Sequence, residues 1–379
     1  MHSKSRIAKV LRRLLIVGTL CEAAAGAAMS PRITATSVVA TPPGSELAIR
    51  LTIESDADLT NQVLYAGDLA TTNWAVLTNW LVAESPYTVT DFLVTQHATR
   101  FYRVVALSSK TATGSVRIPA GDFVMGDPLN NGNADELPLH TNYVGEYHAD
   151  VNLVTFSLWT EVAEWAAEHG YQFGHEGSGK QSDHPVVEVS WYDAVKWCNA
   201  RSEKEGIVPA YWTDQHQTNV YRTGQIDLAA SCVKWEDGYR LPTEAEWEKA
   251  ARGGVSGHNY PWTDTESFSS DRANLLDDPV YSTGLYPHTS PVGTFPANGY
   301  GLYDMAGNVW EWCWDWYGVD WYAAAQDAAD SRGPELGDYR VLRGGSWNDD
   351  PTSARCAKRG LDSSSSAFGF YGIRCVRGQ

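Results

Sequence analysis

The chain has few basic residues, few methionines and no long apolar run after its first segment. Its 379 residues include 29 Lys and Arg against 46 Asp and Glu, a formal net charge of −17. A protein this acidic repels phosphate backbones, so we do not expect nucleic acid as a partner. No stretch beyond the first segment is apolar for as long as a spanning helix requires, and we expect no integral membrane span in the mature chain.

Patterns that hold catalytic metals are also missing. The ten histidines form neither an H-x-x-x-H nor an H-E-x-x-H pattern, the spacings that place two imidazoles on one face of a helix. The apolar fraction of 43% is nevertheless enough to build a core, which excludes a disordered chain. Of the 16 Trp, all but Trp74 and Trp80 follow residue 112, and this uneven distribution predicts two parts of different character.

The first 28 residues have the pattern of a secretory signal peptide. Basic residues precede an apolar run over 14–21, and the small residues Ala25, Gly26 and Ala27 follow. We therefore expect a secreted or periplasmic protein. Five cysteines remain after removal of this segment, and an oxidising compartment favours two disulfides and one free thiol, with the pairing left open by the sequence.

Residues 29–110 have the pattern of short strands. Leu47, Leu51 and Ile53 alternate with polar or small residues, which is the period of a half-buried strand, and the segments 87–90 and 101–105 are further candidates. Several strands without a helix predict a small all-β sandwich. The spacing of these segments resembles fibronectin-type-III-like modules, for which a spacer or adhesion role is typical.

From Val116 onward, helix signals appear among many turns. Ser157 and Ser190 stand where they could cap helices, and Thr243 with Glu246 forms a capping box. Much of the remaining sequence is rich in Gly, Asn, Asp and Trp and has little periodicity. We expect short helices and loops held by aromatic packing, disulfides and metal.

Six sequence blocks occur in an order that identifies a family. They include RLPTEAEWE at 240–248, GNVWEW at 307–312, RGGSW at 343–347 and GFYGIRC at 369–375, after blocks at 118–126 and 185–194. Over about 116–379 the chain resembles the sulfatase-modifying factor family, whose founding activity is that of the formylglycine-generating enzyme. The resemblance implies a C-type-lectin-related fold of the α+β class with little regular secondary structure.

The resemblance also implies which residues surround the family's reaction centre. The enzyme oxidises a client cysteine with O₂ and a copper ion, held by two cysteines that follow the Gly-Gly-Ser motif. In this chain Asp349 stands at the first of those positions, and no residue matches the second. Thiolates suit Cu(I) whereas carboxylates are hard ligands, so we do not expect copper. Ser346 and Trp312 match other pocket positions of the family.

Two functions remain open at this point, beside a purely architectural role in which both domains only space or adhere. In the first, the domain has lost oxidase chemistry and serves as a binding or accessory module. Trp347, Asn348 and Asp349 would then contact a protein or glycan ligand. In the second, the chain is a divergent formylglycine-generating oxidase that acts on a client cysteine through a lone thiol, Cys313 or Cys356.

The resemblance further implies disulfides and calcium. It pairs Cys198 with Cys375, while Cys356 loses its usual partner position and would pair with Cys232, leaving Cys313 free. The implied calcium ligands are the following: Asp304, Gly307, Val309 and Glu311 at one site, and Asn274, Leu275 and Tyr286 at a weaker one. Carboxylate and carbonyl oxygens of this kind are what Ca²⁺ prefers.

Overall fold

The computed structural model describes most of the chain in two compact units, Met1–Ala112 and Thr113–Gln379. The described residues of the first unit are 32–40, 47–54, 60–66, 75–81, 87–91 and 101–107. Those of the second are 114–262, 267–282, 285–324 and 329–378. The segment expected to be a signal peptide lies outside the described residues.

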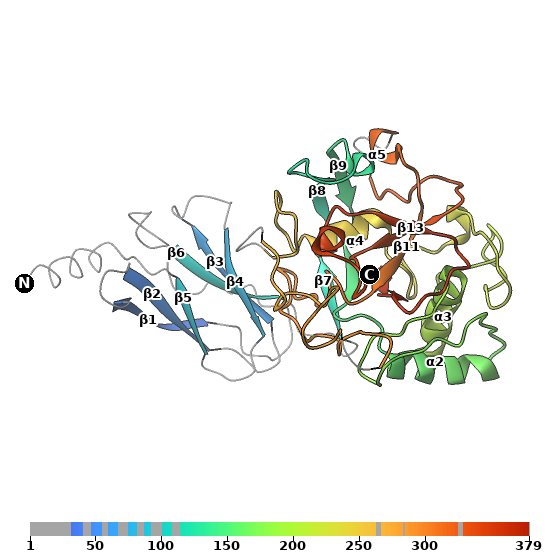
Figure 1. The fold of residues 1–379 in the computed structure, drawn as a ribbon, viewed down its shortest axis with the longest axis horizontal. Coiled ribbons are helices and arrows are strands. Elements are labelled where there is room, and N and C mark those ends of the chain that lie inside the picture. Colours follow the sequence, from blue (N-terminus) through green and yellow to red (C-terminus); the bar gives the residue numbers. More distant parts are fainter. Residues whose placement is uncertain are drawn as a thin grey trace, which may run out of the picture. The chain divides into compact units, whose positions relative to one another are not determined.

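The described part of the first unit consists of antiparallel strands in two sheets (Figure 1). One sheet has the order β1-β2-β5 and the other β4-β3-β6. The strands are β1 Arg32–Ala40, β2 Leu47–Glu54, β3 Thr60–Ala66, β4 Ala75–Leu81, β5 Tyr87–Asp91 and β6 Phe101–Leu107. Leu51 and Ile53 are fully buried around half-buried Thr52, which confirms the alternating pattern expected for this strand.

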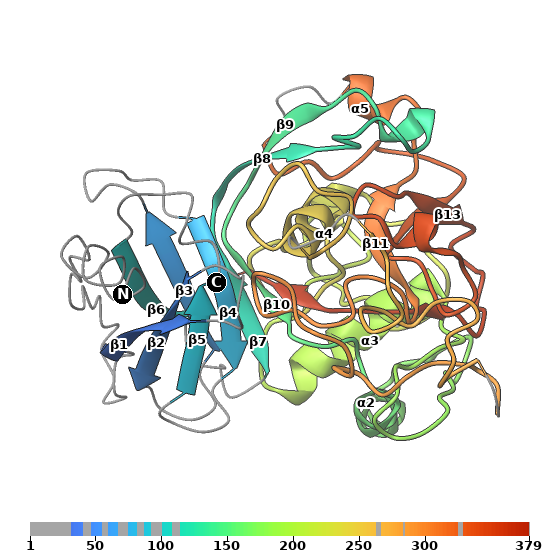
Figure 2. The same ribbon diagram turned by 60° about the vertical axis from the view of Figure 1, so that its left-hand side comes forward.

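The described residues of the second unit form three small sheets. Its beginning and its end meet in one of them, where β7 (Ser115–Ile118) and β15 (Val376–Arg377) flank β10 (Tyr147–Asp150). The strands β8 (Gly121–Met125) and β9 (His140–Val144) pair as an antiparallel hairpin. The third sheet has the order β13-β12-β11-β14, with β11 Trp310–Trp316, β12 Arg340–Arg343, β13 Gly360–Asp362 and β14 Tyr371–Gly372. In Figure 2 the β8–β9 hairpin and α5 (Trp321–Ala324) lie at one end of this unit, as they do in Figure 1.

Short helices cover these sheets, as expected. They are α2 Phe156–Glu168, α3 Trp191–Lys204 and α4 Glu244–Ala251, with 3₁₀ turns η2 Ala134–Glu136, η3 Ala230–Cys232 and η4 Pro351–Ala354. Ser190 caps α3, and Thr243 with Glu246 forms the capping box of α4, both as predicted. The expected cap at Ser157 is wrong: Thr155 accepts the hydrogen bond from Leu158 N, so the helix begins one residue before Ser157. Among the described residues, no helix is both long and apolar enough to cross a bilayer.

Aromatic side chains form the centre of the second unit. Trp159 of α2 and Trp197 of α3 stack with ring centroids 5.3 Å apart and planes 2° from parallel. The guanidinium of Arg340 lies 3.7 Å from the ring centroid of Trp191 and 3.5 Å from that of Trp316. Large flat rings pack tightly without long regular elements, which explains how a domain with so many loops maintains a fixed core.

Candidate functional site

The segment 344–359 follows β12 and carries Ser346 and Asp349, which the family resemblance predicts to lie at the reaction centre. Gly344 and Gly345 both have positive φ, 98° and 73°. A Cβ atom on Gly345 would lie 2.8 Å from the carbonyl oxygen of Ser353. Only glycine fits this sharp turn, which sends the chain back across the edge of the sheet.

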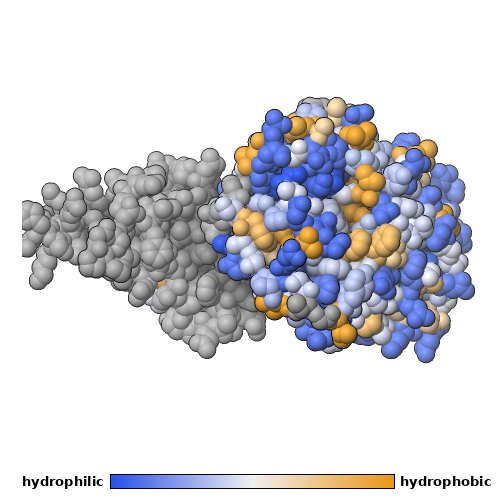
Figure 3. Space-filling view, in the orientation of Figure 1, coloured by the Kyte–Doolittle hydropathy of each residue, from blue (hydrophilic) through white to orange (hydrophobic). Residues whose placement is uncertain are grey.

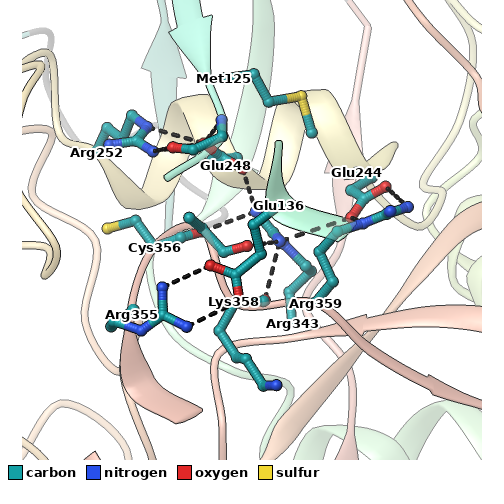
Figure 4. Close-up of polar contacts among 12 residues, drawn as sticks. Met125, Glu136, Glu244, Glu248, Arg252, Arg343, Arg355, Cys356, Lys358 and Arg359 are labelled. Carbon is teal, nitrogen blue, oxygen red and sulfur yellow. Dashed lines mark hydrogen bonds and ion pairs between the residues drawn. The ribbon is translucent and has the colours of Figure 1, made fainter. Parts of the chain in front are cut away.

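Buried ion pairs hold both ends of this segment (Figure 4). At its start, Arg343 pairs with Glu248 of α4. At its end, Arg355 donates two hydrogen bonds to Glu136, at 2.5 and 2.8 Å, and Arg359 donates two to Glu244, at 2.7 and 2.9 Å. Because these charges are removed from water, breaking one pair would leave its partner uncompensated, and the segment is therefore fixed in one conformation.

Asp349 is held at the centre of the segment by two donors. Its Oδ2 accepts from the indole nitrogen of Trp310 at 2.9 Å and from the hydroxyl of Ser346 at 2.5 Å. Its backbone carbonyl accepts from Leu276 N at 2.9 Å. Ser346 is fully buried, Asp349 is half-buried and Asn348 is exposed. The structure therefore brings together the two family positions Ser346 and Asp349.

Trp312, expected at a family pocket position, and Trp347, expected to contact a ligand, are both largely buried. Trp312 is fully buried and donates from its indole nitrogen to the carbonyl of Val189 at 3.0 Å. Trp347 is 7% exposed and donates to the carbonyl of Gly369 at 3.0 Å. Both indoles thus satisfy buried backbone groups, and Trp312 has no surface to offer a ligand.

Other aromatic side chains occupy the surface next to Asp349. Trp347 contacts Tyr286 edge-on, with ring centroids 5.5 Å apart, and Phe370 at 6.4 Å. Phe370 stacks in turn on Phe368 at 5.4 Å. Tyr286 is 58% exposed and Phe368 is 47% exposed. We call Tyr286, Trp347, Phe368 and Phe370 the aromatic face.

The cysteines lie in the core, away from this segment's centre. Cys198 and Cys375 are fully buried with their sulfurs 3.6 Å apart and unbonded. The expected Cys232–Cys356 bridge is not formed, because Cys232 packs in the hydrophobic cluster around α3 and Cys356 in the one around α4. Cys313 is also fully buried. Burial raises the pKa of the Cys198 and Cys313 thiols well above the usual value, so both are protonated at neutral pH.

The positions of the cysteines and the partners of Asp349 show whether a copper site with two thiolate ligands fits at Asp349. The hydrogen-bond partners of Asp349 are an indole, a hydroxyl and a backbone amide of the same surface, and none is a thiol. Across the described ranges of the second unit, three or more His, Cys, Asp or Glu side chains nowhere gather as a metal-binding group. The donor set around Asp349 therefore does not fit copper held by two cysteines.

The first implied calcium site has its two carboxylates engaged with protein groups. Glu311 is fully buried, pairs with Arg374 at 3.0 Å and accepts from the Trp247 indole at 2.9 Å. Asp304 accepts from Gly293 N at 2.7 Å, and burial raises its pKa to about 6. Because Arg374 already compensates the charge of Glu311, this carboxylate is less available to a cation than the sequence suggested.

The second implied calcium site contains a buried oxygen atom that accepts no hydrogen bond from the described residues. The Asn274 side chain is buried, and its amide nitrogen donates to the carbonyl of His288 at 2.9 Å. Its Oδ1 is buried without a hydrogen-bond partner among the described residues. A buried amide oxygen of this kind fits a calcium ligand. The site that looked weaker from the sequence therefore has the better fit, although Gly284, opposite the family's aspartate, lies outside the described residues.

Sequence reasoning missed three residues of this surface. Trp310 holds Asp349, Phe368 is the exposed end of the aromatic face, and Glu188 donates its backbone N–H to the carbonyl of Phe368 at 3.0 Å. Glu188 has φ of 59°, the left-handed conformation that glycine prefers. The sequence offers one signal, the dense aromatic run at 368–371, but the run itself does not indicate which of its rings is exposed.

Comparison with known families agrees with this geometry. A model described as the sulfatase-modifying factor enzyme 1-like domain matches residues 102–379. The chain belongs to this family. The capping box of α4 and the glycine turn before Ser346 both lie within the matched residues.

Individual relatives carry different names. The formylglycine-generating enzyme of Thermomonospora curvata is 35% identical over 70% of this chain and 93% of its own length. The serine/threonine-protein kinase pkn1 of Chlamydia caviae is 34% identical over 70% of this chain, which spans only 38% of that protein. Among solved structures, Treponema denticola variable protein 1 has a TM-score of 0.56 and 29% identity, with 69% of this chain and 94% of that one covered.

Proposed function

We propose that this chain is an exported binding or accessory module of the family, without copper-dependent cysteine oxidase activity. The observation that carries the proposal is the environment of Asp349. A carboxylate replaces the first copper thiolate, and Trp310 and Ser346 hold it in place through hydrogen bonds. A charged group so held is suited to contact a ligand, whereas it cannot supply the soft sulfur that Cu(I) requires.

The positions of the cysteines support the same proposal. A catalytic thiol must be exposed enough to reach its substrate and must ionise readily. Cys313 and Cys356 are fully buried, and burial raises the pKa of Cys356 to about 12. The two closest sulfurs, those of Cys198 and Cys375, lie in the core beside Arg201 and Asp150 rather than beside Asp349.

The rival function is a divergent formylglycine-generating oxidase. Copper-loaded full-length protein is incubated in air with a Cys-x-Pro-x-Arg peptide, and the peptide mass is followed. A copper-loaded oxidase of the family serves as the positive control. We expect the thiol mass to persist in the sample with this chain. Conversion of the thiol to the aldehyde above the rate with free copper would overturn the proposal.

Export and calcium are parts of the same proposal. The basic, apolar and small-residue pattern of residues 1–28 supports a cleaved leader, and N-terminal sequencing of the secreted product tests it. The unpartnered Oδ1 of Asn274 supports a structural Ca²⁺ near the aromatic face. We also propose that the six strands of the first unit form a small sandwich that serves as a spacer or adhesion module.

A further inference from the structure

Arg340 of β12 differs from every other buried arginine in the described part of the chain, because it forms no ion pair. Arg340 is 0% exposed. The other buried arginines each pair with an aspartate or a glutamate, and they are Arg201, Arg240, Arg252, Arg343, Arg355, Arg359 and Arg374. A buried lone charge costs far more free energy than a paired one, so this exception requires a physical reason.

The neighbours of Arg340 are aromatic rings and one carbonyl. The rings of Trp191 and Trp316 lie against the guanidinium, with centroids 3.7 and 3.5 Å from Cζ, and Nη1 donates to the carbonyl of Trp314 at 2.5 Å. These tryptophans are buried, whereas the side of the protein drawn in Figure 3 shows a mostly hydrophilic surface with separate apolar patches. Nε and Nη2 are buried as well and have no hydrogen-bond partner among the described residues. Aromatic rings attract a cation but do not satisfy these two N–H donors.

Nε and Nη2 form the edge with which a guanidinium donates two hydrogen bonds to one anion. The chain uses this edge elsewhere in its core. Arg252 donates from both atoms to Glu248, at 3.0 and 2.6 Å, and Arg359 donates from both to Glu244, at 2.7 and 2.9 Å. The same edge of Arg340 has the donors for an anion, but none of the described side chains accepts from it.

Two carboxylates lie within electrostatic range of Arg340, and neither neutralises it. Asp227 is exposed and accepts from the hydroxyl of Tyr192 at 2.7 Å. Asp315 accepts from the backbone N–H of Glu244, and burial raises its pKa well above the usual value, which favours the neutral acid. Burial lowers the pKa of Arg340 to about 9, still above neutral pH, so its guanidinium remains a cation.

The charge and the geometry of this edge define its ligand. We infer that Nε and Nη2 of Arg340 bind one small monovalent inorganic anion, such as chloride, within the aromatic core. One guanidinium neutralises one negative charge, whereas sulfate or phosphate would bring a surplus charge into the core. A water molecule could accept from the same donors but would leave the charge uncompensated. Because protein interiors are close-packed, a single-atom ion also fits such a position better than a polyatomic one.

Bound chloride would join three elements of the domain around one ion. Arg340 belongs to β12, Trp316 to β11 and Trp191 to α3. We therefore expect the anion to stabilise the fold. This role does not depend on whether the domain is an oxidase, so the inference and the proposed function can fail separately.

Anomalous diffraction tests the site directly. Crystals of the full-length protein are transferred from sodium chloride to sodium bromide, and data are collected at the bromine absorption edge. We expect an anomalous peak in contact with both Nε and Nη2 of Arg340. An ordered water molecule at this edge, without anomalous signal, would overturn the inference.

Thermal unfolding tests the effect on stability. The Tm of the full-length protein is measured in about 0.15 M sodium chloride and in sodium gluconate of equal ionic strength, because gluconate is too bulky for a buried site. An anion present at ten times its Kd should make the Tm roughly 3–6 °C higher in chloride. The same Tm in both salts would contradict the inference.

Two variants assign the effect to Arg340. Arg340→Gln removes the cation and should give the same Tm in chloride and in gluconate. Arg332→Gln is the matched control, because the Arg332 guanidinium also lies over a tryptophan ring, that of Trp235 at 4.1 Å, but is half-buried. This control should retain the full chloride effect. Circular dichroism verifies folding, and if Arg340→Gln does not fold, the bromide data on the wild type decide.

Two further results would overturn the inference. The first is a chloride effect of equal size in the wild type and in Arg340→Gln, which would place the anion elsewhere. The second is bromide at Arg340 only at molar concentration and without any chloride effect on the Tm, which would make it an adventitious ion only.

Discussion

The indole nitrogen of Trp310 donates a hydrogen bond to Oδ2 of Asp349 at 2.9 Å, and this contact fixes the carboxylate that we propose stands at the position of the family's first copper cysteine. Trp310 belongs to β11 at the centre of the largest sheet of the unit, and Asp349 belongs to the segment that follows β12. A rigid strand thus orients a charged group on a loop, which is the arrangement expected of a preorganised binding site.

Removing the Trp310 donor should destabilise the domain. Trp310→Phe preserves most of the ring volume but leaves Asp349 with only the Ser346 hydroxyl on Oδ2. A hydrogen bond to a charged group contributes about 1.5–3 kcal/mol, so we expect a loss of this size in urea denaturation. Trp321→Phe is the matched control, since no hydrogen bond from the Trp321 indole is present in the described residues. Equal effects of the two substitutions would show that the contact contributes little.

Cys198 and Cys375 should be the pair that becomes oxidised. Their sulfurs are 3.6 Å apart, and a disulfide bond needs about 2.05 Å, so a small side-chain movement closes it. After the reduced, unfolded protein is refolded in a glutathione redox buffer, mass mapping of the non-reduced protein should find these two peptides linked. Because Cys232 and Cys356 lie in different clusters, a Cys232–Cys356 link would contradict the structure.

His184 should make the protein less stable in mild acid. Its imidazole is buried, Nδ1 lies 2.9 Å from the Thr289 hydroxyl, and burial lowers its pKa below the usual 6.5. The unfolded chain therefore binds a proton more readily than the folded chain, so stability is complete above about pH 6.5 and falls as the pH decreases below that value.

The measurement compares free energies of unfolding at pH 7.5 and pH 5.5 in the wild type and in His184→Gln. The difference between the two pH values should be smaller in the variant, since it has no imidazole to protonate. Replacement of exposed His216 by glutamine is the control and should leave the difference unchanged. An identical pH dependence in all three proteins would exclude a role for His184.

Calcium removal tests the site around Asn274. If Ca²⁺ completes the coordination of the buried Oδ1, a concentration 100 times the Kd stabilises the fold by about 2.7 kcal/mol. For a domain of this size, EGTA should then lower the Tm by roughly 5–10 °C, and excess Ca²⁺ but not Mg²⁺ should restore it. Asn274→Ala should abolish the difference. The same Tm in EGTA and in excess Ca²⁺ would contradict the site.

Local signals in the sequence predicted the short elements of the fold. They could not predict which side chains are buried or which residues those side chains contact. The caps at Ser190 and Thr243 depend on residues three positions apart, so the sequence contains all that is needed to see them. Thr155 rather than Ser157 caps the helix, and either hydroxyl is of a type that can accept from a backbone amide two or three residues further on. Only tertiary packing decides between two such neighbours.

In the candidate site, too, the sequence predicts what lies within one short segment but not what depends on tertiary packing. The proximity of Asp349 to Ser346 could be expected from the sequence, because both lie within one short segment, while the replacement of a copper cysteine by Asp349 stays a prediction from the family resemblance. The burial of Trp312 could not be predicted, since an indole beside a pocket and one beneath it look alike in sequence. The separation of Cys232 from Cys356 likewise depends on how α3 and α4 pack, which no spacing along the chain encodes.

The most direct measurement of the central claim is a Cu(I) titration of the fully reduced protein in competition with a chromogenic chelator, next to an oxidase of the family. With Asp349 at the proposed position of the first copper thiolate, we predict that this chain leaves Cu(I) on a chelator from which the oxidase removes it. One tightly bound equivalent of Cu(I) that is lost in Cys356→Ser or Cys313→Ser but retained in Asp349→Asn would contradict the account.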